Sequence, residues 1–229
     1  PLVTTTASAL TLPPRPAGVL AVSIADEMRL AQQLGRAFPP VAAQAEALAR
    51  DAVESSGGLR VDDDVFVLPT VSGAILAAVA VQRAVQQHPW APGAAVAVSV
   101  AVDTSPQRPV PLEVVDRARH LALRGHGEQI LLSAEARAEA ALTPSPDVSL
   151  VDLGRHHLDE RGVTAPVYQA VAQGLRVAIA PPRDDRSVPN NLPPDATEFV
   201  GREAERAALR EALEGARLVT LRGPGGVGK

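Results

Sequence analysis

The stretch HGEQILLS, residues 126–133, decides the fold together with the segments on either side of it. Residues 129–132 within it predict a short strand. Residues 112–123 before it repeat apolar side chains at helical spacing and predict an amphipathic helix, and residues 134–142 after it predict a short helix. The centre of the chain therefore predicts helices that alternate with strands.

The residues outside this unit continue the alternation. A short buried strand at 18–24 precedes a helical pattern at 27–53, for which Asp26 is the candidate N-cap and which Pro39 and Pro40 must break or kink. The remaining predicted elements are a hairpin at 59–68, a helix at 71–87, and strands at 95–103, 148–158 and 167–171. This order contains the ferredoxin-like βαββαβ arrangement and predicts an α/β (α+β) fold, a sheet with helices on one face.

Several separate stretches match the sequence motifs of one enzyme family and occur in the same order. They are residues 115–121 (VDRARHL) leading into HGEQILLS, 151–158 (VDLGRHHL), 166–170 (PVYQA) and 29–35 (RLAQQLG), with glycines at 57 and 58. These stretches resemble class III nucleotidyl cyclase catalytic domains, which make cyclic nucleotides from ATP or GTP. The resemblance implies the cyclase fold, chemistry with two metal ions held by two carboxylates, and sites formed at a dimer interface.

The residues at the family's metal-binding positions depart from its pattern. Alignment through Arg29 and Leu30 places Ser23 where the family has its first metal aspartate, and a neutral hydroxyl cannot replace that carboxylate. The second metal aspartate belongs to the hairpin, where Asp64 is the nearest candidate. The alternative is that the three consecutive aspartates there are solvated turn residues that initiate the hairpin.

The helix before HGEQILLS carries two more departures. The resemblance matches the family's ribose-orienting asparagine to Asp116 and its phosphate-stabilising arginine to His120. An aspartate would repel a triphosphate, and a mostly neutral histidine lacks the guanidinium fork. Arg117 and Arg119 lie about 100° to either side of the required face. The family's adenine-selecting lysine has no counterpart in residues 17–173. Together these departures predict a cyclase fold without catalytic residues or cyclase activity.

The C-terminal stretch GPGGVGK matches the phosphate-binding loop GxxxxGK of P-loop NTPases. Its candidate cofactor-binding residues are Gly223, Gly225, Gly226, Gly228 and Lys229. Backbone N–H groups of such a loop cradle phosphates, and the lysine reaches the β- and γ-phosphates of ATP. The Ser or Thr that ligates Mg²⁺ is missing, so ATP with Mg²⁺ is expected to act only in a longer parent protein. The alternative is a simple turn.

The residues before this loop carry a second resemblance. They are NNLPP (190–194), FVGRE (199–203), a helical pattern at 204–214 and a strand pattern at 216–221. They resemble the entry to the STAND-type ATPase module of large bacterial regulators, such as the actinobacterial LuxR-type proteins. The predicted domains are an extended leader (1–16), a degenerate cyclase-like domain (17–173), a Pro-rich linker (174–195) and the start of a P-loop ATPase module (196–229).

Composition narrows the function classes. The net charge of −4 provides no basic footprint for nucleic acid, so DNA contact is expected only through segments absent here. The chain has no cysteine, which excludes disulfides and thiolate metal sites. No apolar run is long enough to span a membrane and no signal peptide is present, which predicts a cytoplasmic protein without membrane contact.

Three functions fit these features. The favoured one is a sensory or dimerisation domain in an ATP-dependent signalling protein such as a transcriptional regulator. Such a domain is expected to form a homodimer or to bind a nucleotide ligand. The second is a cyclase that is active or gains its missing groups from a partner chain. The third is a structural spacer. The ligand, the oligomeric state, the output domain and the target genes are left open by the sequence.

Overall fold

The computed structural model describes residues 16–157 and 164–183, with residues 205, 207–209, 211, 212, 219 and 220 in addition. The chain divides into two compact units, Pro1–Val188 and Pro189–Lys229, and the sheet lies in the first. In the second unit, residues 205, 207–209, 211 and 212 are helical. The phosphate-loop residues 223–229 and all but the last residue of the predicted leader lie outside the described residues.

The first unit contains the strands and helices in the predicted order. They are β1 (Ala17–Ile24), α1 (Glu27–Leu34), the 3₁₀ turn η1 (Gly35–Ala37), α2 (Phe38–Ser55), β2 (Leu59–Arg60), β3 (Val65–Leu68), α3 (Val71–Gln87), β4 (Val98–Ser105), α4 (Leu112–Arg124), β5 (Ile130–Ser133), α5 (Ala134–Leu142), β6 (Val148–His157) and β7 (Thr164–Ala172). The predicted α/β (α+β) fold class is confirmed, and α3 and α5 have the predicted bounds.

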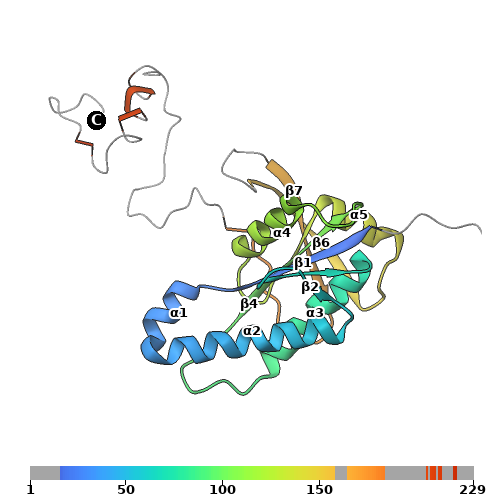
Figure 1. Ribbon diagram of the computed structural model, residues 1–229, viewed down its shortest axis with the longest axis horizontal. Helices are drawn as coiled ribbons and strands as arrows, with labels where there is room; N and C mark the ends of the chain where they lie inside the picture. Colours follow the sequence, from blue (N-terminus) through green and yellow to red (C-terminus); the bar gives the residue numbers. More distant parts are fainter. Residues whose placement is uncertain are drawn as a thin grey trace, which may run out of the picture. The chain divides into compact units, whose positions relative to one another are not determined.

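Seven strands form one sheet in the order β2-β3-β1-β4-β5-β7-β6 (Figure 1). The β4–β5 pair is parallel and the other pairs are antiparallel. β1 lies between β3 and β4, with Ala21 opposite Val65 and Ser23 opposite Ser99. This pairing brings the carboxyl end of β1 beside the turn that joins β2 to β3.

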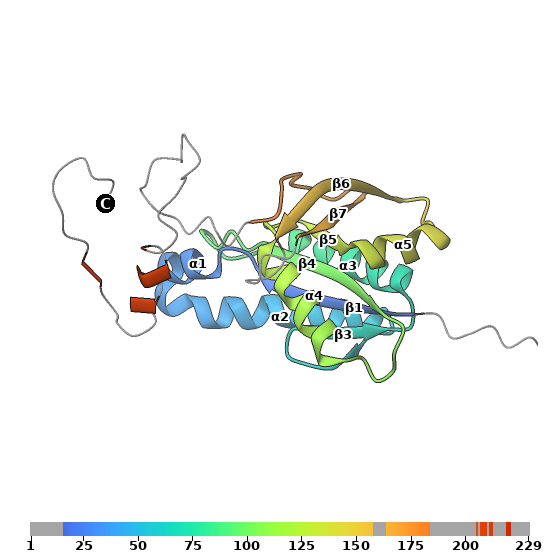
Figure 2. The same cartoon turned by 90° about the horizontal axis from the view of Figure 1, so that it is seen from above.

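Helices cover both faces of the sheet, because its central strands are buried on both sides. Leu20 and Val100 belong to a core with α2, α3 and α5, whereas Val19 and Ala101 belong to a second core with α4. The helices α2, α3 and α5 thus share one face, and α4 packs on the other (Figures 1 and 2). A prediction of helices on one face alone misses α4, although the uninterrupted apolar run of β1 already requires cover on both faces.

The predicted break in the first helical segment lies just before its prolines. The turn η1 separates α1 from α2, and Gly35 there has a φ of 53°, which glycine adopts without strain. Pro39 and Pro40 lie in the first turn of α2, where their missing N–H groups leave no helical hydrogen bond unmade. Among the described residues, none of the helices has the length and apolarity that crossing a membrane requires.

Candidate functional site

A cleft lies beside the carboxyl end of β1. It consists of two adjoining cavities of about 420 and about 500 Å³, which share Ser23, Ile24, Glu27 and Leu123 as lining residues. The larger cavity extends to α2 and to the turn between β2 and β3, and the smaller one to α1 and to the segment after β7. Volumes of this size suit a small ligand.

Ser23 and Asp64, the two positions that the sequence relates to metal binding, line the larger cavity together. The backbone N–H of Val22 donates to the backbone oxygen of Asp64 at 3.0 Å and ties the hairpin turn to β1. Both side chains are half-buried. The fold therefore brings together two residues that are distant in the sequence, and a role in cation binding stays a prediction for each.

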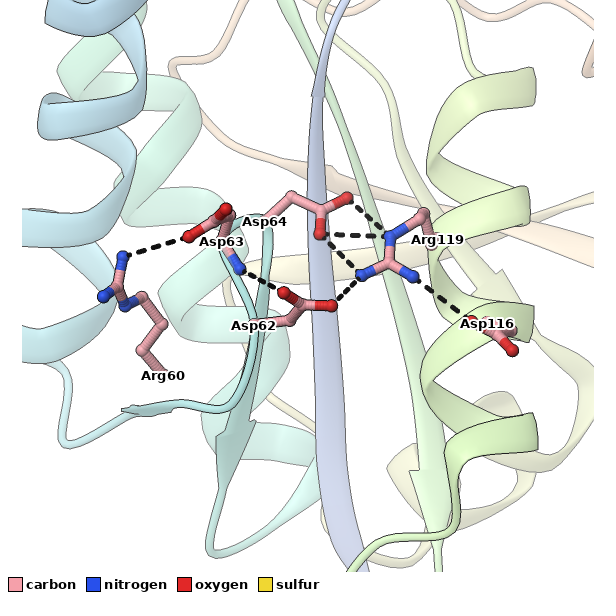
Figure 3. Close-up of polar contacts among 6 residues, drawn as sticks. All are labelled: Arg60, Asp62, Asp63, Asp64, Asp116 and Arg119. Atoms are coloured by element: carbon pink, nitrogen blue, oxygen red, sulfur yellow. Dashed lines mark hydrogen bonds and ion pairs between the residues drawn. The ribbon is translucent and has the colours of Figure 1, made fainter.

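Arg119 of α4 lies among the acids of the hairpin turn and of its own helix (Figure 3). Its Nε and Nη2 donate to the carboxylate of Asp64 at 2.9 to 3.1 Å, and Nη2 also donates to Asp62 at 2.5 Å. Its Nη1 donates to Asp116 at 3.2 Å. The hydrogen bond with Asp64 raises the pKa of Arg119, burial opposes this, and Asp62 adds to it. One fixed cation therefore holds three carboxylates.

The hairpin turn is also held by its own backbone. The carboxylate of Asp62 accepts a hydrogen bond from the backbone N–H of Asp63 at 2.8 Å, as an aspartate that initiates a turn does. This bond, followed by the bond with Arg119, lowers the pKa of Asp62, while slight desolvation opposes the change. Asp63 pairs with Arg60 at 3.6 Å on the surface. Asp62 thus serves the turn, whereas both oxygens of Asp64 face Arg119.

The ion pair between Asp62 and Arg119 is expected to persist from neutral pH to below pH 3.8, the ordinary pKa of aspartate, and to be lost as the pH falls further. A carboxylate whose pKa is lowered by folding stabilises the fold above its unfolded pKa and stops doing so when it is protonated. NMR titration of the Asp62 carboxyl carbon measures the midpoint. In Arg119→Gln the midpoint should rise, because the hydrogen bond and the charge of Arg119 are both lost. A wild-type midpoint at or above 3.8 would contradict this.

The other predicted positions on α4 point in different directions. Asp116 accepts from Arg119, and His120 is exposed. Arg117 turns away and donates from Nε to the buried carboxylate of Asp103 at 2.5 Å. Arg117 and Arg119 therefore diverge, as the period of an α-helix requires. The sequence alone does not predict the partners of Arg119. The one indication is the run of three aspartates at 62–64, whose charges favour a nearby cation.

The residues of the cleft do not fit the two-metal arrangement that the cyclase fold implies. Asp64 is the hairpin carboxylate nearest to β1, and its oxygens already accept from Arg119. Ser23 supplies a neutral hydroxyl where a second carboxylate is needed. Across residues 16–157 and 164–183, no group of three or more His, Asp or Glu side chains is arranged to hold a metal ion.

The smaller cavity has its own charged pair. Asp26 occupies the predicted N-cap position of α1 with a φ of 52°, but its side chain makes no capping hydrogen bond. The Asp26 carboxylate instead pairs with Arg29 at 3.3 Å and with Arg183 at 2.6 Å. Partial burial raises the pKa of Asp26, but the bonds and charges of Arg183 and then Arg29 outweigh it and lower the pKa. The Asp26 carboxylate therefore links the first turn of α1 to the segment after β7.

Comparison with known sequences finds distant relatives. No family model matches the chain. Uncharacterized proteins of Mycobacterium tuberculosis and Mycobacterium bovis are 37% identical to it over 94 residues, which is 40% of this chain and 32% of those proteins. The match therefore spans about a third of the length of these relatives, and their names record no activity.

Comparison with solved structures is more informative. An adenylate cyclase of Trypanosoma brucei, described in its monomeric state, covers 80% of this chain and all of its own, with a TM-score of 0.56 and 18% identity. The guanylate cyclase domain of RhGC from Catenaria anguillulae, in complex with GTP, gives 0.54 at 10% identity, with 69% and 97% coverage. A non-canonical dimeric guanylyl cyclase domain from Blastocladiella emersonii gives 0.54 at 11%, with the same coverage. At such identities the likeness establishes the fold alone: the first unit of this chain has the fold of adenylate and guanylate cyclase domains.

Proposed function

We propose that residues 16–183 form a regulatory domain that has the cyclase fold and does not catalyse nucleotide cyclisation. The observation that carries the proposal is the position of Arg119, whose guanidinium binds Asp64, Asp62 and Asp116 at once. A cyclase needs two metal ions to activate the ribose oxygen and to neutralise the α-phosphate. Here an arginine of the chain itself pairs with the acids of that region and offsets one of their three charges.

The remaining departures support the same proposal. Ser23 lies at the end of β1 and cannot supply the carboxylate of a metal site. Asp116 is bound to Arg119 instead of being free to orient a ribose, and His120 is exposed on α4. The negative charge of Asp116 would repel a triphosphate, and His120 lacks the fixed positive charge of an arginine. No single group compensates for all of these losses.

The cleft is a candidate binding site through which such a domain could detect a ligand. Its two cavities are large enough for a nucleotide-sized ligand, and relatives of the same fold include a domain bound to GTP and a dimeric domain. Met28 and Leu123, which line the smaller cavity, are 77% and 57% exposed, which suits a surface that pairs with a second copy of the domain. We propose that homodimer formation, a nucleotide ligand, or both regulate the protein.

The catalytic part of the proposal is tested by incubating the purified chain with Mn²⁺ and either ATP or GTP. No cyclic product above background is expected, while an active cyclase serves as the positive control. The double variant S23D/H120R should remain inactive, because Arg119 still holds Asp64 and no base-selecting lysine is present. Cyclic product from the wild-type chain, or cyclase activity in the double variant, would contradict the proposal.

The same assay separates the second function, a cyclase completed by a partner chain. Product that forms only on mixing with such a partner would support that function. Calorimetric titration of the chain with GTP and cyclic nucleotides, repeated with Lys229→Ala to remove the lysine of the C-terminal loop, tests ligand sensing. Sedimentation of the same samples tests pairing. A monomer that binds none of these ligands would favour a structural spacer.

The C-terminal loop extends the proposal to a parent protein. The predicted phosphate-binding residues Gly223 to Lys229 support an ATP-dependent, cytoplasmic signalling protein in which a STAND-type module follows the cyclase-like domain. Transcription regulation and DNA contact through other segments belong to this wider proposal. ATP hydrolysis by the parent protein, compared with its Lys229→Ala variant, is the direct measurement. Equal rates would remove the loop from the proposal.

A further inference from the structure

The segment after β7, residues 174–183, contacts α3 and residues in and beside the sheet; we call this segment the strap. Gln86 of α3 binds the backbone of Arg176 twice: its amide nitrogen donates to the Arg176 oxygen at 2.9 Å, and its Oε1 accepts from the Arg176 N–H at 3.0 Å. The Arg176 guanidinium pairs with Glu128 at 3.2 Å. Residues at the start of a predicted Pro-rich linker therefore make fixed contacts with the domain.

Two glutamines with no exposed surface hold the middle of the strap. Gln169 donates to the backbone oxygen of Ala178 at 2.8 Å, and Gln129 donates to that of Ala180 at 2.8 Å. The Gln129 amide also donates to the Gln169 oxygen at 2.9 Å. Departure of the strap would remove acceptors from buried N–H groups, which is costly. The middle of the strap is therefore firmly held.

The end of the strap reaches the cleft and is held differently. The Arg183 backbone N–H donates to the Arg124 oxygen at 2.7 Å, and its guanidinium lies 2.6 Å from the Asp26 carboxylate. Arg183 and Asp26 both line the smaller cavity. Their side chains are 34% and 40% exposed, so this ion pair is screened by solvent and weaker than the buried contacts. The exposed end is therefore the part that detaches first.

We propose that the Asp26–Arg183 pair is a latch that couples the cleft to the strap. A charged occupant of the smaller cavity that engages either side chain loosens residues 181–183, which keep their contacts with the His126 ring and the Arg124 carbonyl, while the buried glutamines keep residues 176–180 in place. Release of the latch therefore loosens the carboxyl-terminal end of the strap and leaves its middle in place. The inference rests on the proposed regulatory function, but its test does not depend on nucleotide chemistry.

Limited trypsin digestion of the chain tests the latch, since trypsin cleaves after Arg183. Asp26→Asn keeps the cleavage site and removes the charge that holds it. Cleavage after Arg183, followed by mass spectrometry, should become about two- to fivefold faster, because cleavage of a transiently open segment follows the open population. Hydrogen exchange at the Arg183 amide should accelerate by a similar factor.

Arg29→Gln is the matched control. It removes the other ion pair of Asp26 and touches no residue of the strap, so cleavage after Arg183 should not change. The melting temperatures of both variants show whether global unfolding is the cause. Equal cleavage and exchange in Asp26→Asn and the wild type would overturn the latch, and so would an equal acceleration in Arg29→Gln. Neither outcome changes the expected result of the cyclase assay, so the latch can be disproved while the proposed regulatory function stands.

Discussion

Replacement of Asp103 by alanine is expected to lower the free energy of unfolding by about 1.5–3 kcal/mol, because hydrogen bonds to a buried carboxylate are lost while the half-exposed Arg117 side chain turns to solvent. The Asp103 side chain is only 1% exposed and pairs with Arg117 of α4 at 2.5 Å. Its other oxygen accepts from the hydroxyl of Ser133 at 2.6 Å and from the backbone N–H of Thr104 at 2.8 Å. One carboxylate in β4 thus fixes α4 and the junction of β5 with α5.

Chemical denaturation with equal slopes for wild type and variant measures this loss. Asp51→Ala, an exposed acid of α2, is the matched control and should change the free energy by no more than about 0.5 kcal/mol. Arg117→Ala should also destabilise strongly, because it leaves a buried carboxylate without its cation. If Asp103→Ala costs less than about 1 kcal/mol, the network is not what holds α4 on the sheet.

Arg119→Gln is expected to lower the free energy of unfolding by about 1–2 kcal/mol, a modest loss because the three carboxylates are partly exposed to solvent, and to make stability respond to divalent cations. The variant removes the cation that Asp62, Asp64 and Asp116 share, and it leaves their charges opposed to one another. Mn²⁺ should then raise the melting temperature of the variant and leave that of the wild type unchanged. Ligand binding at 100 times its dissociation constant adds about 2.7 kcal/mol.

Arg60→Gln provides the control within the same hairpin. Arg60 forms an ion pair with Asp63, whose side chain is 97% exposed, so this variant should keep nearly all of its stability and show no response to Mn²⁺. A loss as large as that of Arg119→Gln would mean that the hairpin depends on its net charge and not on one bridging guanidinium. An equal Mn²⁺ response of the wild type would contradict the proposal that Arg119 takes the place of a cation.

Local patterns predicted most of the fold. Thr70 and Ser133 begin α3 and α5 with side-chain caps, and the sequence places both helices correctly because cap and apolar spacing agree. The side of the sheet that α4 covers is a different matter. Its apolar stripe is visible in the sequence, but the face that it meets is decided by tertiary packing of alternate residues in β1 and β4.

The candidate site was predicted less completely. The resemblance to cyclases predicted Ser23 and Asp64 as site positions, and both line one cavity. The pairing of Arg119 with Asp64 depends on how α4 is rotated and shifted relative to the hairpin, which no local pattern encodes. The strap could not be predicted for a related reason: its anchors are Gln129, just before β5, and Gln169 within β7, and their partners are backbone oxygens of a segment whose composition predicts a linker.

The central place of β1 has a consequence for how the chain folds during synthesis. β1 pairs with β3 and β4, and β4 begins at Val98, far along the chain from the end of β1 at Ile24. At about 5–20 residues per second, β1 therefore waits roughly 4–15 s for β4 to be made. Its apolar run has one unpaired edge during that interval, so the nascent chain is expected to depend on chaperones that shield strand edges until Val98–Ser105 has emerged.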